Sequence, residues 1–397
     1  MKKHVLILLL CLAISSCQEN NGEILPSEEF VPAFIVDTNL AQLAKRVSVS
    51  NQVAFDVKDD QTNLTYNKVA DVSPNQVNGH ILSATGVAYL DDLVYVTYHV
   101  RGDVYGGEIL TFDVSSPSQP QLISSLVDEF ADYNDIMMGQ FSSNVWVAGA
   151  RDIYNSGYEN TDGAIATKIG LNNDKTPKNV ASWEIPLLSY SASSITRVQP
   201  PAGASNGRIF ITSGSKGGLE VVRGNDENEI FHSRQTDNAK HFDYYNEQGV
   251  FLRGIDGSSS AIDVYALDDS FAFSTYNIPY DVTYLGKNGI DVTDGFAFLA
   301  MGDDGLIKVS TTDGTIAATY NSNGNGDANA VMVDGDYVYL ANGSDGLIIL
   351  RTSDLSFVAN YKYDGSCNYV DIKGDLLFLA NGSTGGLIIL EKTSGSS

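Results

Sequence analysis

The pattern of apolar and polar positions along the chain is that of short β-strands separated by tight turns. An alternating stretch (Ala330 to Val333) meets an Asp-Gly turn, and an aromatic and β-branched run (Tyr337 to Ala341) follows it. A second glycine turn leads to an apolar run (Leu347 to Leu350) and then to a looser fourth stretch (Ser356 to Tyr363). Such runs, bounded by Gly, Asn and Asp, predict strands and hairpins, and no window has a sustained helical period.

This four-strand pattern repeats along the chain. The phrase LANGSDGLIIL, from Leu340 to Leu350, returns as LANGSTGGLIIL from Leu379 to Leu390, and fainter copies lie upstream. The matching positions of seven units are Val96, Val147, Ile211, Leu252, Leu299, Leu340 and Leu379. Their spacings of 39 to 64 residues lie near the ~40 to 50 residues of known blade repeats. The sequence therefore predicts an all-β fold, a seven-bladed β-propeller with loop insertions in its early units.

The two ends of the repeat region predict how the ring closes. The last unit stops at Glu391 and Lys392, directly after its third strand. The stretch Asn63 to Val69 precedes the first unit and has the composition of the missing fourth strand, so we expect it to pair beside Leu387 to Leu390. A closed ring leaves no sheet edge exposed to other chains. Val53 to Val57 also has the pattern of a strand, but the repeats assign it to no blade.

The N-terminus predicts export and lipidation. Lys2 and Lys3 precede an apolar run from Val5 to Ile14, which is typical of a secretory signal and is too short for a permanent membrane span. The residues up to Cys17 resemble the lipobox of bacterial lipoproteins, in which cleavage before the cysteine allows acyl chains such as palmitate to be attached to it. We expect a signal peptide at 1–16, the lipidated Cys17 and an acidic tether at 17–46, and the propeller at 47–397.

The repeat phrase itself resembles a known family. An aromatic strand, a glycine turn and a Gly-Leu-Ile-Ile-Leu run are similar to the LVIVD repeat, and the segment Phe112 to Pro117 resembles the family's trailing Asp-Val-Ser-x-Pro. The resemblance is strongest over residues 288–392. It implies a β-propeller, often on secreted or surface proteins, and no single activity. Acidic residues soon after the lipidated cysteine resemble the surface-export signal of Bacteroidota-type outer-membrane lipoproteins, and Glu19 matches it; an ordinary acidic linker is the alternative.

Charge and cysteine content agree with an exported protein. The formal net charge is -25 at pH 7, which argues against nucleic acid and against direct adhesion to an anionic bilayer. Cys11 leaves with the predicted signal peptide and Cys17 is the predicted lipidation site, so Cys367 has no partner for a disulfide.

Candidate catalytic chemistry is sparse. The sequence contains no nucleophile elbow, phosphate-binding loop or zinc-protease helix, and we expect neither enzyme activity nor a cofactor. No two of its histidines have metal-ligand spacing. Asp303, Asp304, Asp345 and the stretch 323–329 could offer oxygens to calcium, but Asn, Asp and Gly are also what tight turns require.

One group of candidate site residues follows from aligning the repeats. In six of the seven units, the position just before the alternating run of the innermost strand holds Thr85, Asn134, Lys240 with His241, Asn288, Asn329 or Asn368. In a propeller they surround one mouth of the central channel, with Asp243, Asp291 and Asp371 deeper along the same strands. They predict either a ligand or partner site or a ring of side chains that bonds free backbone groups at strand starts.

The loops between units predict where a partner would bind. We expect long loops at Asp128 to Asn134, Pro186 to Ser194 and Asn321 to Ala328, with Leu187 and Leu188 forming an exposed apolar patch or, alternatively, a small core under the loop. The leading hypothesis is a non-enzymatic binding or scaffold lipoprotein on the cell-surface side of the outer membrane. Its expected partner is an outer-membrane β-barrel protein or a neighbouring lipoprotein. The alternatives are a carbohydrate-binding or glycan-processing propeller, with a glycan as partner, and a calcium-dependent adhesin.

Overall fold

The computed structural model describes residues 31–394 of the protein, except for residues 59–62, 140–141, 155–161, 199–206, 224–225, 269, 283–285, 323, 325 and 383. The predicted signal peptide, Cys17 and the predicted tether up to residue 30 lie outside the described residues.

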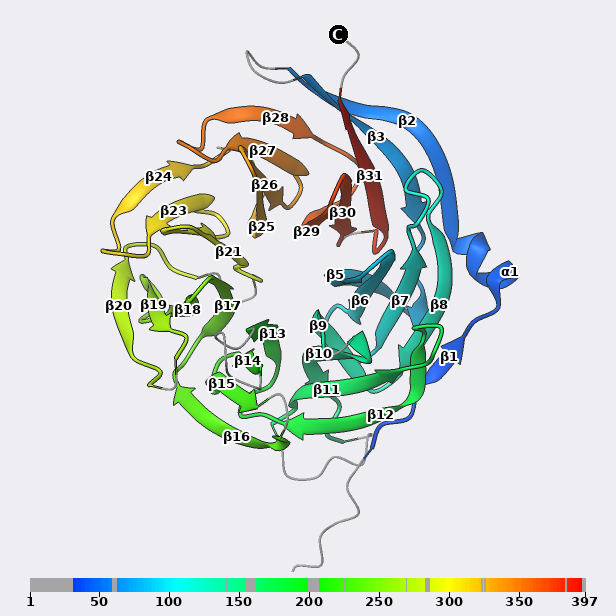
Figure 1. The fold of residues 1–397 in the computed structure, drawn as a ribbon, viewed down its shortest axis with the longest axis horizontal. Coiled ribbons are helices and arrows are strands. Elements are labelled where there is room, and N and C mark those ends of the chain that lie inside the picture. The colour runs from blue at the N-terminus through cyan, green and yellow to red at the C-terminus, as the bar shows by residue number, and fades with distance from the viewer. Residues whose placement is uncertain are drawn as a thin grey trace, which may run out of the picture. The chain divides into compact units, whose positions relative to one another are not determined.

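Seven antiparallel sheets surround a central channel and form the predicted seven-bladed β-propeller (Figure 1). Each blade has four strands, A to D, from the channel outwards. The A strands are β5 (His80–Leu90), β9 (Ala131–Met138), β13 (Ala192–Val198), β17 (Ala239–Tyr245), β21 (Ile290–Thr293), β25 (Ala328–Asp334) and β29 (Cys367–Lys373). The B strands are β6 (Leu93–Val100), β10 (Asn144–Arg151), β14 (Arg208–Ser213), β18 (Gln248–Gly254), β22 (Phe296–Ala300), β26 (Tyr337–Asn342) and β30 (Leu376–Asn381). The C strands are β7 (Gly107–Asp113), β11 (Ala164–Leu171), β15 (Gly218–Arg223), β19 (Ser260–Ala266), β23 (Leu306–Ser310), β27 (Leu347–Arg351) and β31 (Leu387–Ser394). The D strands are β8 (Gln121–Asp128), β12 (Pro177–Pro186), β16 (Asp226–Gln235), β20 (Phe273–Ile278), β24 (Ile316–Tyr320), β28 (Phe357–Tyr361) and β3 (Asn63–Val72).

Hydrophobic packing between neighbouring blades holds the ring together. The described residues form seven apolar clusters, one at each blade-to-blade interface. The run Leu347 to Leu350 is buried along its whole length because both faces of its sheet pack against a neighbouring blade. A single repeat has no neighbour to cover these faces, so the ring is the smallest unit that buries them.

The N-terminal strand closes the ring as predicted. β3 pairs with β31, with Leu64 opposite Ser394 and Val72 opposite Leu387. β3 therefore supplies the D strand that the last repeat lacks. The predicted strand Val53 to Val57 belongs to β2 (Val47–Lys58), which pairs with β3 as a fifth, outermost strand of blade 7.

Residues 32–58, here called the N-terminal belt, run along the outer edges of three blades (Figure 1). Ala33 bridges to Val180 in blade 2, β1 (Ile35–Asp37) pairs with β8 in blade 1, and β2 lies on blade 7. α1 (Leu40–Leu43) and the 3-10 helix η1 (Ala44–Arg46) connect β1 to β2. Residues 33–46, which the predicted boundaries place in the tether, are thus part of the propeller's outer surface.

A glycine in the repeat phrase joins consecutive blades. Gly343, at the end of strand B in blade 6, exchanges two backbone hydrogen bonds of 2.8 and 2.9 Å with Cys367, the first residue of β29 in blade 7. Its φ is +51°, and a Cβ there would lie 2.8 Å from the backbone nitrogen of Asp327. Gly302 and Ala328 make the same exchange between blades 5 and 6. In blades 5 and 6 the glycine after strand B therefore makes an inter-blade contact.

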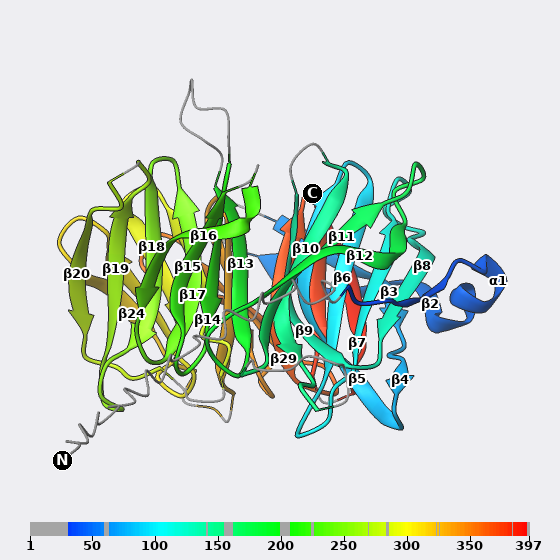
Figure 2. The same cartoon turned by 90° about the horizontal axis from the view of Figure 1, so that it is seen from below.

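The strands run between two loop-bearing faces of the ring (Figure 2). The D–A face carries the loops from strand D to the next strand A and from B to C, and the A–B face carries the turns from A to B and from C to D. The expected long loop from Asp128 to Asn134 is wrong, since only Glu129 and Phe130 separate β8 from β9. The Asp128 carboxylate accepts a hydrogen bond from the Phe130 N–H and fixes this as a tight turn.

The D–A connections at 187–191 and 321–327 are longer, although residues 323 and 325 of the second lie outside the described part. The short strand β4 (Gln76–Val77) pairs with the start of β5 in the corresponding connection of blade 1. No helix among the described residues is long and apolar enough to cross a membrane.

Candidate functional site

The residues predicted at the channel mouth occupy one equivalent position in each blade. In six blades the pairing between strands A and B shifts register near the start of strand A, and one residue of strand A bulges out of the ladder. The bulged residues are Thr85, Asn134, Ser193, Lys240, Asn329 and Asn368, and Asn288 precedes β21 at the matching place. A bulge leaves backbone groups without ladder partners, which favours polar side chains nearby.

Three of these side chains bond the backbone of the next blade. The Thr85 hydroxyl donates to the carbonyl oxygen of Tyr133 at 2.6 Å, and the Asn134 amide donates to that of Ala192 at 2.8 Å. The Ser193 hydroxyl donates to the carbonyl oxygen of Lys240 at 2.7 Å. The ring of bulges therefore links blades 1, 2, 3 and 4 by side-chain hydrogen bonds.

The remaining asparagines bond within their own blades. The Asn288 amide donates to the carbonyl oxygen of Ala300, the Asn329 amide donates to that of Asp327, and the Asn368 side-chain oxygen accepts from the Ser366 hydroxyl. Every predicted asparagine thus satisfies a backbone or side-chain group of the protein at this mouth.

A second layer of acidic residues lies deeper in the channel. The Asp135 carboxylate accepts a hydrogen bond from the N–H of Ile195 at 2.9 Å. Asp243 accepts from Val292 at 2.8 Å, and Asp291 accepts from Val333 at 2.5 Å. Each bond runs from the A strand of one blade to the A strand of the next, so these aspartates cap N–H groups on the innermost, otherwise unpaired strand edges. Asp371, the third predicted aspartate, bonds the N–H of Ile372 in its own strand.

Burial raises the pKa of each of these carboxylates. The pKa of Asp243 rises to about 6 and that of Asp371 to about 7, first by burial and further by neighbouring carboxylates. The pKa of Asp291 is raised well above its usual range by burial and then by repulsion from Asp243. Burial also raises the pKa of Asp135, and Lys287 opposes this rise. The channel interior therefore tolerates negative charge poorly and favours a proton or a cation.

Lys287 spans the channel mouth. It precedes strand β21 of blade 5, and its ammonium group donates to the carbonyl oxygens of Thr85 in blade 1 and Asn134 in blade 2. The nitrogen lies 4.4 Å from the ring centroid of Tyr369 in blade 7. Burial lowers the pKa of Lys287 to about 8, and Asp135 opposes this shift. The ammonium group thus contacts three blades other than its own.

Two histidines lie near this lysine. The Nδ1 of His99 is 2.9 Å from the side-chain oxygen of Asn134, and burial lowers the His99 pKa to about 4. Burial, assisted by Lys287, lowers the pKa of His241 to about 3. Both rings are therefore neutral near pH 7. The Nδ1 of His241 is buried and has no hydrogen-bond partner among the described residues.

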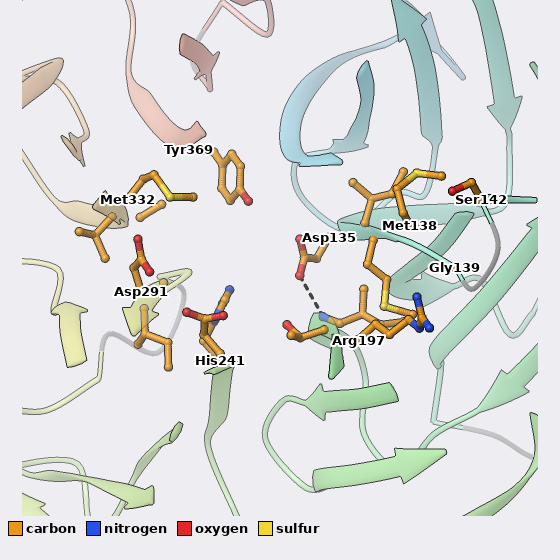
Figure 3. A pocket seen from close by; sticks show the side chains of 18 residues that line it. Asp135, Met138, Gly139, Ser142, Arg197, His241, Asp291, Met332 and Tyr369 are labelled. Carbon is orange, nitrogen blue, oxygen red and sulfur yellow. Dashed lines mark hydrogen bonds between the residues drawn. The ribbon is translucent and has the colours of Figure 1, made fainter. Parts of the chain in front are cut away.

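A cavity of about 470 Å³ occupies the channel below the bulge ring (Figure 3). Residues from six A strands line it, including Asp135, His241, Asp291 and Tyr369. It extends to Met138, Gly139 and Ser142 of the first A–B turn after β9 and to Arg197 at the end of β13. Because Lys287 crosses the D–A end, the cavity is directed towards the A–B face.

Sequence reasoning missed Asp135, Ser193 and Lys287. Asp135 lies one residue after the bulge at Asn134, where the alignment predicted no acidic residue. Ser193 was not predicted because blade 3 has no asparagine at the bulge position. Lys287 directly precedes the predicted Asn288, but no local pattern indicates that its side chain reaches three other blades.

Of the two leucines in the predicted apolar patch, the structure buries one and exposes the other. Leu187 is 4% exposed and belongs to the hydrophobic cluster between blades 2 and 3, whereas Leu188 is 47% exposed. The expectation of an exposed pair is therefore wrong for Leu187, whose side chain packs under the loop.

Residues 325–361, which lie in blade 6 and its connections, match the LVIVD repeat. Comparison with curated protein sequences gave no match. Among solved structures, the chain is similar to the WD40 β-propeller domain of Doa1, with a TM-score of 0.56 and 12% identity over 87% of this chain and 97% of that chain. It is also similar to the WD40 repeats of RRP9, with a TM-score of 0.54 and 12% identity over 81% of this chain and all of that chain. At this identity the likeness shows the fold alone.

Proposed function

We propose that the protein is a non-enzymatic scaffold lipoprotein, anchored through Cys17 in the outer membrane and facing the cell surface. Its propeller docks an outer-membrane β-barrel protein or a neighbouring lipoprotein. The fold and the lipobox-like sequence before Cys17 support this proposal. Several acyl chains confine the protein to the membrane plane, which raises the effective concentration of partners in the same membrane, so a modest interface suffices.

The evidence for the position of the partner site is a group of exposed apolar and aromatic side chains on the D–A face of blades 2 and 3. We call this group the docking surface. Its members are Phe130, Tyr154, Leu188 and Tyr190, which are 42, 89, 47 and 56% exposed. They come from the turn before β9, the loop after β10 and the loop before β13. Exposed aromatic residues are enriched at the energetic centres of protein interfaces.

The backbone of the loop 187–191 is held in place on both sides. The Leu187 N–H donates to the carbonyl oxygen of Ala164 at 2.8 Å, and the Ala164 N–H donates to that of Ser189 at 3.0 Å. In blade 3, the Ser213 hydroxyl donates to the carbonyl oxygen of Leu188 at 2.9 Å. A loop ordered before binding loses less conformational entropy when a partner docks.

Tyr190 is also ordered by charged neighbours. The Lys216 ammonium lies 4.2 Å from the centroid of its ring and 3.5 Å from the Asp162 carboxylate. The docking surface thus combines apolar contact area with a polar rim, which is the usual arrangement of a protein interface.

Site-specific photo-crosslinking in outer membranes tests the proposal. A photoreactive residue at Leu188 should capture one recurrent membrane protein, identified by mass spectrometry. The same residue at Asp294, an exposed position on the A–B face, should not capture it. Leu188→Ser and Tyr190→Ser should reduce copurification of that protein at unchanged melting temperature. Equal capture at both positions, or none at Leu188, would overturn the docking face.

A carbohydrate partner is the second candidate, because Tyr154 and Tyr190 are exposed aromatic rings that could stack on sugars. Binding of the purified propeller to a glycan array, abolished by Tyr154→Ala, would favour it. The calcium-dependent adhesin has no comparable support, since no group of three His, Cys, Asp or Glu among the described residues is arranged to hold a metal ion.

A further inference from the structure

The channel cavity is separate from the docking surface and has a chemistry of its own. Its lining carries three carboxylates, Asp135, Asp243 and Asp291, against one guanidinium, Arg197. No ion pair involves these three aspartates in the described part of the chain. Each accepts a hydrogen bond from a neutral backbone N–H, which leaves its negative charge without a cation in contact.

Lys287 is not a contact cation for these three aspartates. Its ammonium group is bonded to the carbonyl oxygens of Thr85 and Asn134, and it forms no ion pair with a described carboxylate within 4.0 Å. It also closes the D–A end of the channel, so a ligand would enter from the A–B face, past Ser142 and Arg197.

A second observation points to a ligand. The His241 side chain lines the cavity, and its buried Nδ1 has no partner among the described residues (Figure 3). Buried polar atoms are rarely left unpaired, because an atom that loses its hydrogen bonds to water without replacement destabilises the folded state. A hydrogen-bonding molecule in the cavity would satisfy this atom.

The lining also limits the kind of cation. No three metal-ligating side chains of the described residues converge on one point, so the lining offers an organic cation a better fit than a metal ion. The carboxylates come from strands β9, β17 and β21, and Met137, Ile290 and Met332 lie among them on the cavity wall. Ammonium groups separated by methylene chains would match carboxylates that are separated by apolar side chains.

We propose that the channel cavity binds a small organic polyamine, whose ammonium groups lie against Asp135, Asp243 and Asp291 and one of whose N–H or neutral amine groups bonds His241. The bound cation neutralises carboxylates that form no ion pair with another described residue. The site opens on the face opposite the docking surface, so ligand and partner can be bound together.

Isothermal titration calorimetry with spermidine at pH 8 tests this site. The wild-type protein should bind one spermidine per chain and should not bind 1,8-octanediol, a neutral chain of similar length. Asp243→Asn and Asp291→Asn keep an acceptor for the neighbouring N–H and should each weaken spermidine binding about tenfold, equivalent to about 1.4 kcal/mol. Asp294→Asn removes the same charge from an exposed turn on the A–B face and should leave affinity within about twofold.

A second measurement keeps the proposal testable if the channel variants do not fold. In wild-type protein with 15N-labelled histidine, spermidine should shift the ring signals of His241 and leave those of the exposed His80 in place. Absence of wild-type binding, equal affinity of all three Asn variants, or unchanged His241 signals would each overturn the proposal.

Discussion

The hydroxyl groups of Tyr66 and Tyr339 share a buried hydrogen bond of 2.8 Å between blades 6 and 7. Tyr66 lies on the closing strand β3 and Tyr339 on β26 of blade 6, so the bond joins residues 273 positions apart in the sequence. The ring of Tyr66 also stacks on Phe55 of β2, with centroids 4.5 Å apart. The N-terminal strands are therefore packed against blade 6 as well as paired in blade 7.

Removal of the closing strand should destroy the ring. Deletion of residues 1–72 leaves β31 with an unpaired edge and uncovers the cluster between blades 6 and 7, so we expect aggregation and loss of cooperative unfolding. Deletion of residues 1–30 keeps the closing strand and the cluster between blades 6 and 7, so it should leave the melting temperature unchanged. Size-exclusion chromatography and thermal unfolding of both proteins measure this, and equal stability would show that closure is not needed.

The N-terminal belt should contribute through one ion pair in particular. Arg46 makes a bidentate pair with Glu108 at 2.6 and 2.9 Å, and the Glu108 side chain is fully buried. Arg46→Met leaves this carboxylate buried without its cation and should lower the free energy of unfolding by about 3–5 kcal/mol. Lys45→Met, at the exposed neighbouring position, should cost under about 0.5 kcal/mol.

Adding Glu108→Gln to Arg46→Met should restore part of the loss, because the neutral amide needs no cation. Urea unfolding of the three variants measures these differences. A loss in Arg46→Met that Glu108→Gln does not reduce would show that packing, and not charge, holds the belt.

The predicted anchor should be independent of the fold. Cys17→Ala should abolish partitioning with membranes and leave the melting temperature of the propeller unchanged, because the closing strand and the described apolar clusters are formed by residues from Phe34 onwards. Membrane fractionation and mass spectrometry of the N-terminus measure this. Acyl chains found at another residue of the variant would refute the assignment of Cys17.

The two leucines of the docking loop should behave differently. Leu187→Ser opens a cavity in the cluster between blades 2 and 3 and buries a hydroxyl group, and should cost about 2–5 kcal/mol of unfolding free energy. Leu188→Ser alters an exposed side chain and should change it by under about 0.5 kcal/mol while weakening partner binding. Urea unfolding and copurification separate the two effects; loss of binding in neither variant would remove this loop from the interface.

Asp371 should make the protein less stable as pH rises. Its folded-state pKa of about 7 exceeds the ordinary value of 3.8, so between these values the folded chain holds a proton that the unfolded chain has released. Its contribution to stability therefore falls as pH rises from about 4 to about 7 and is constant above that. Since Asn does not titrate, Asp371→Asn should gain stability relative to wild type over this interval, by up to about 4 kcal/mol.

Urea unfolding at pH 4.5 and pH 8 measures this difference, with the exposed Asp375→Asn as a control. Because His99 and His241 titrate equally in wild type and variant, their opposite pH dependence cancels in the comparison. A difference between Asp371→Asn and wild type that does not change with pH would show that the carboxyl group is not perturbed.

The sequence alone determined the number of blades, their strands and the closing strand. Each blade is built from local hairpins, so the alternation of apolar and polar residues and the turn residues that specify it lie within about forty consecutive residues. It also located the ring of Thr85, Asn134, Asn288, Asn329 and Asn368, since the position repeats with the blade. The tertiary structure alone showed that this position is a β-bulge at Thr85, Asn134, Asn329 and Asn368. It also showed that these side chains bond backbone groups, except for Asn368, which bonds the Ser366 hydroxyl.

Contacts between segments distant in sequence could not be read from a local pattern. The path of the N-terminal belt over blades 2, 1 and 7 depends on which outer edges are free once the ring has closed. The burial of Leu187 beside the exposed Leu188 depends on how one loop crosses blade 3, and the reach of Lys287 to Thr85 and Asn134 depends on the width of the channel. Periodicity specifies the strands, whereas closure of the ring sets the distances between them, and those distances decide which side chains meet.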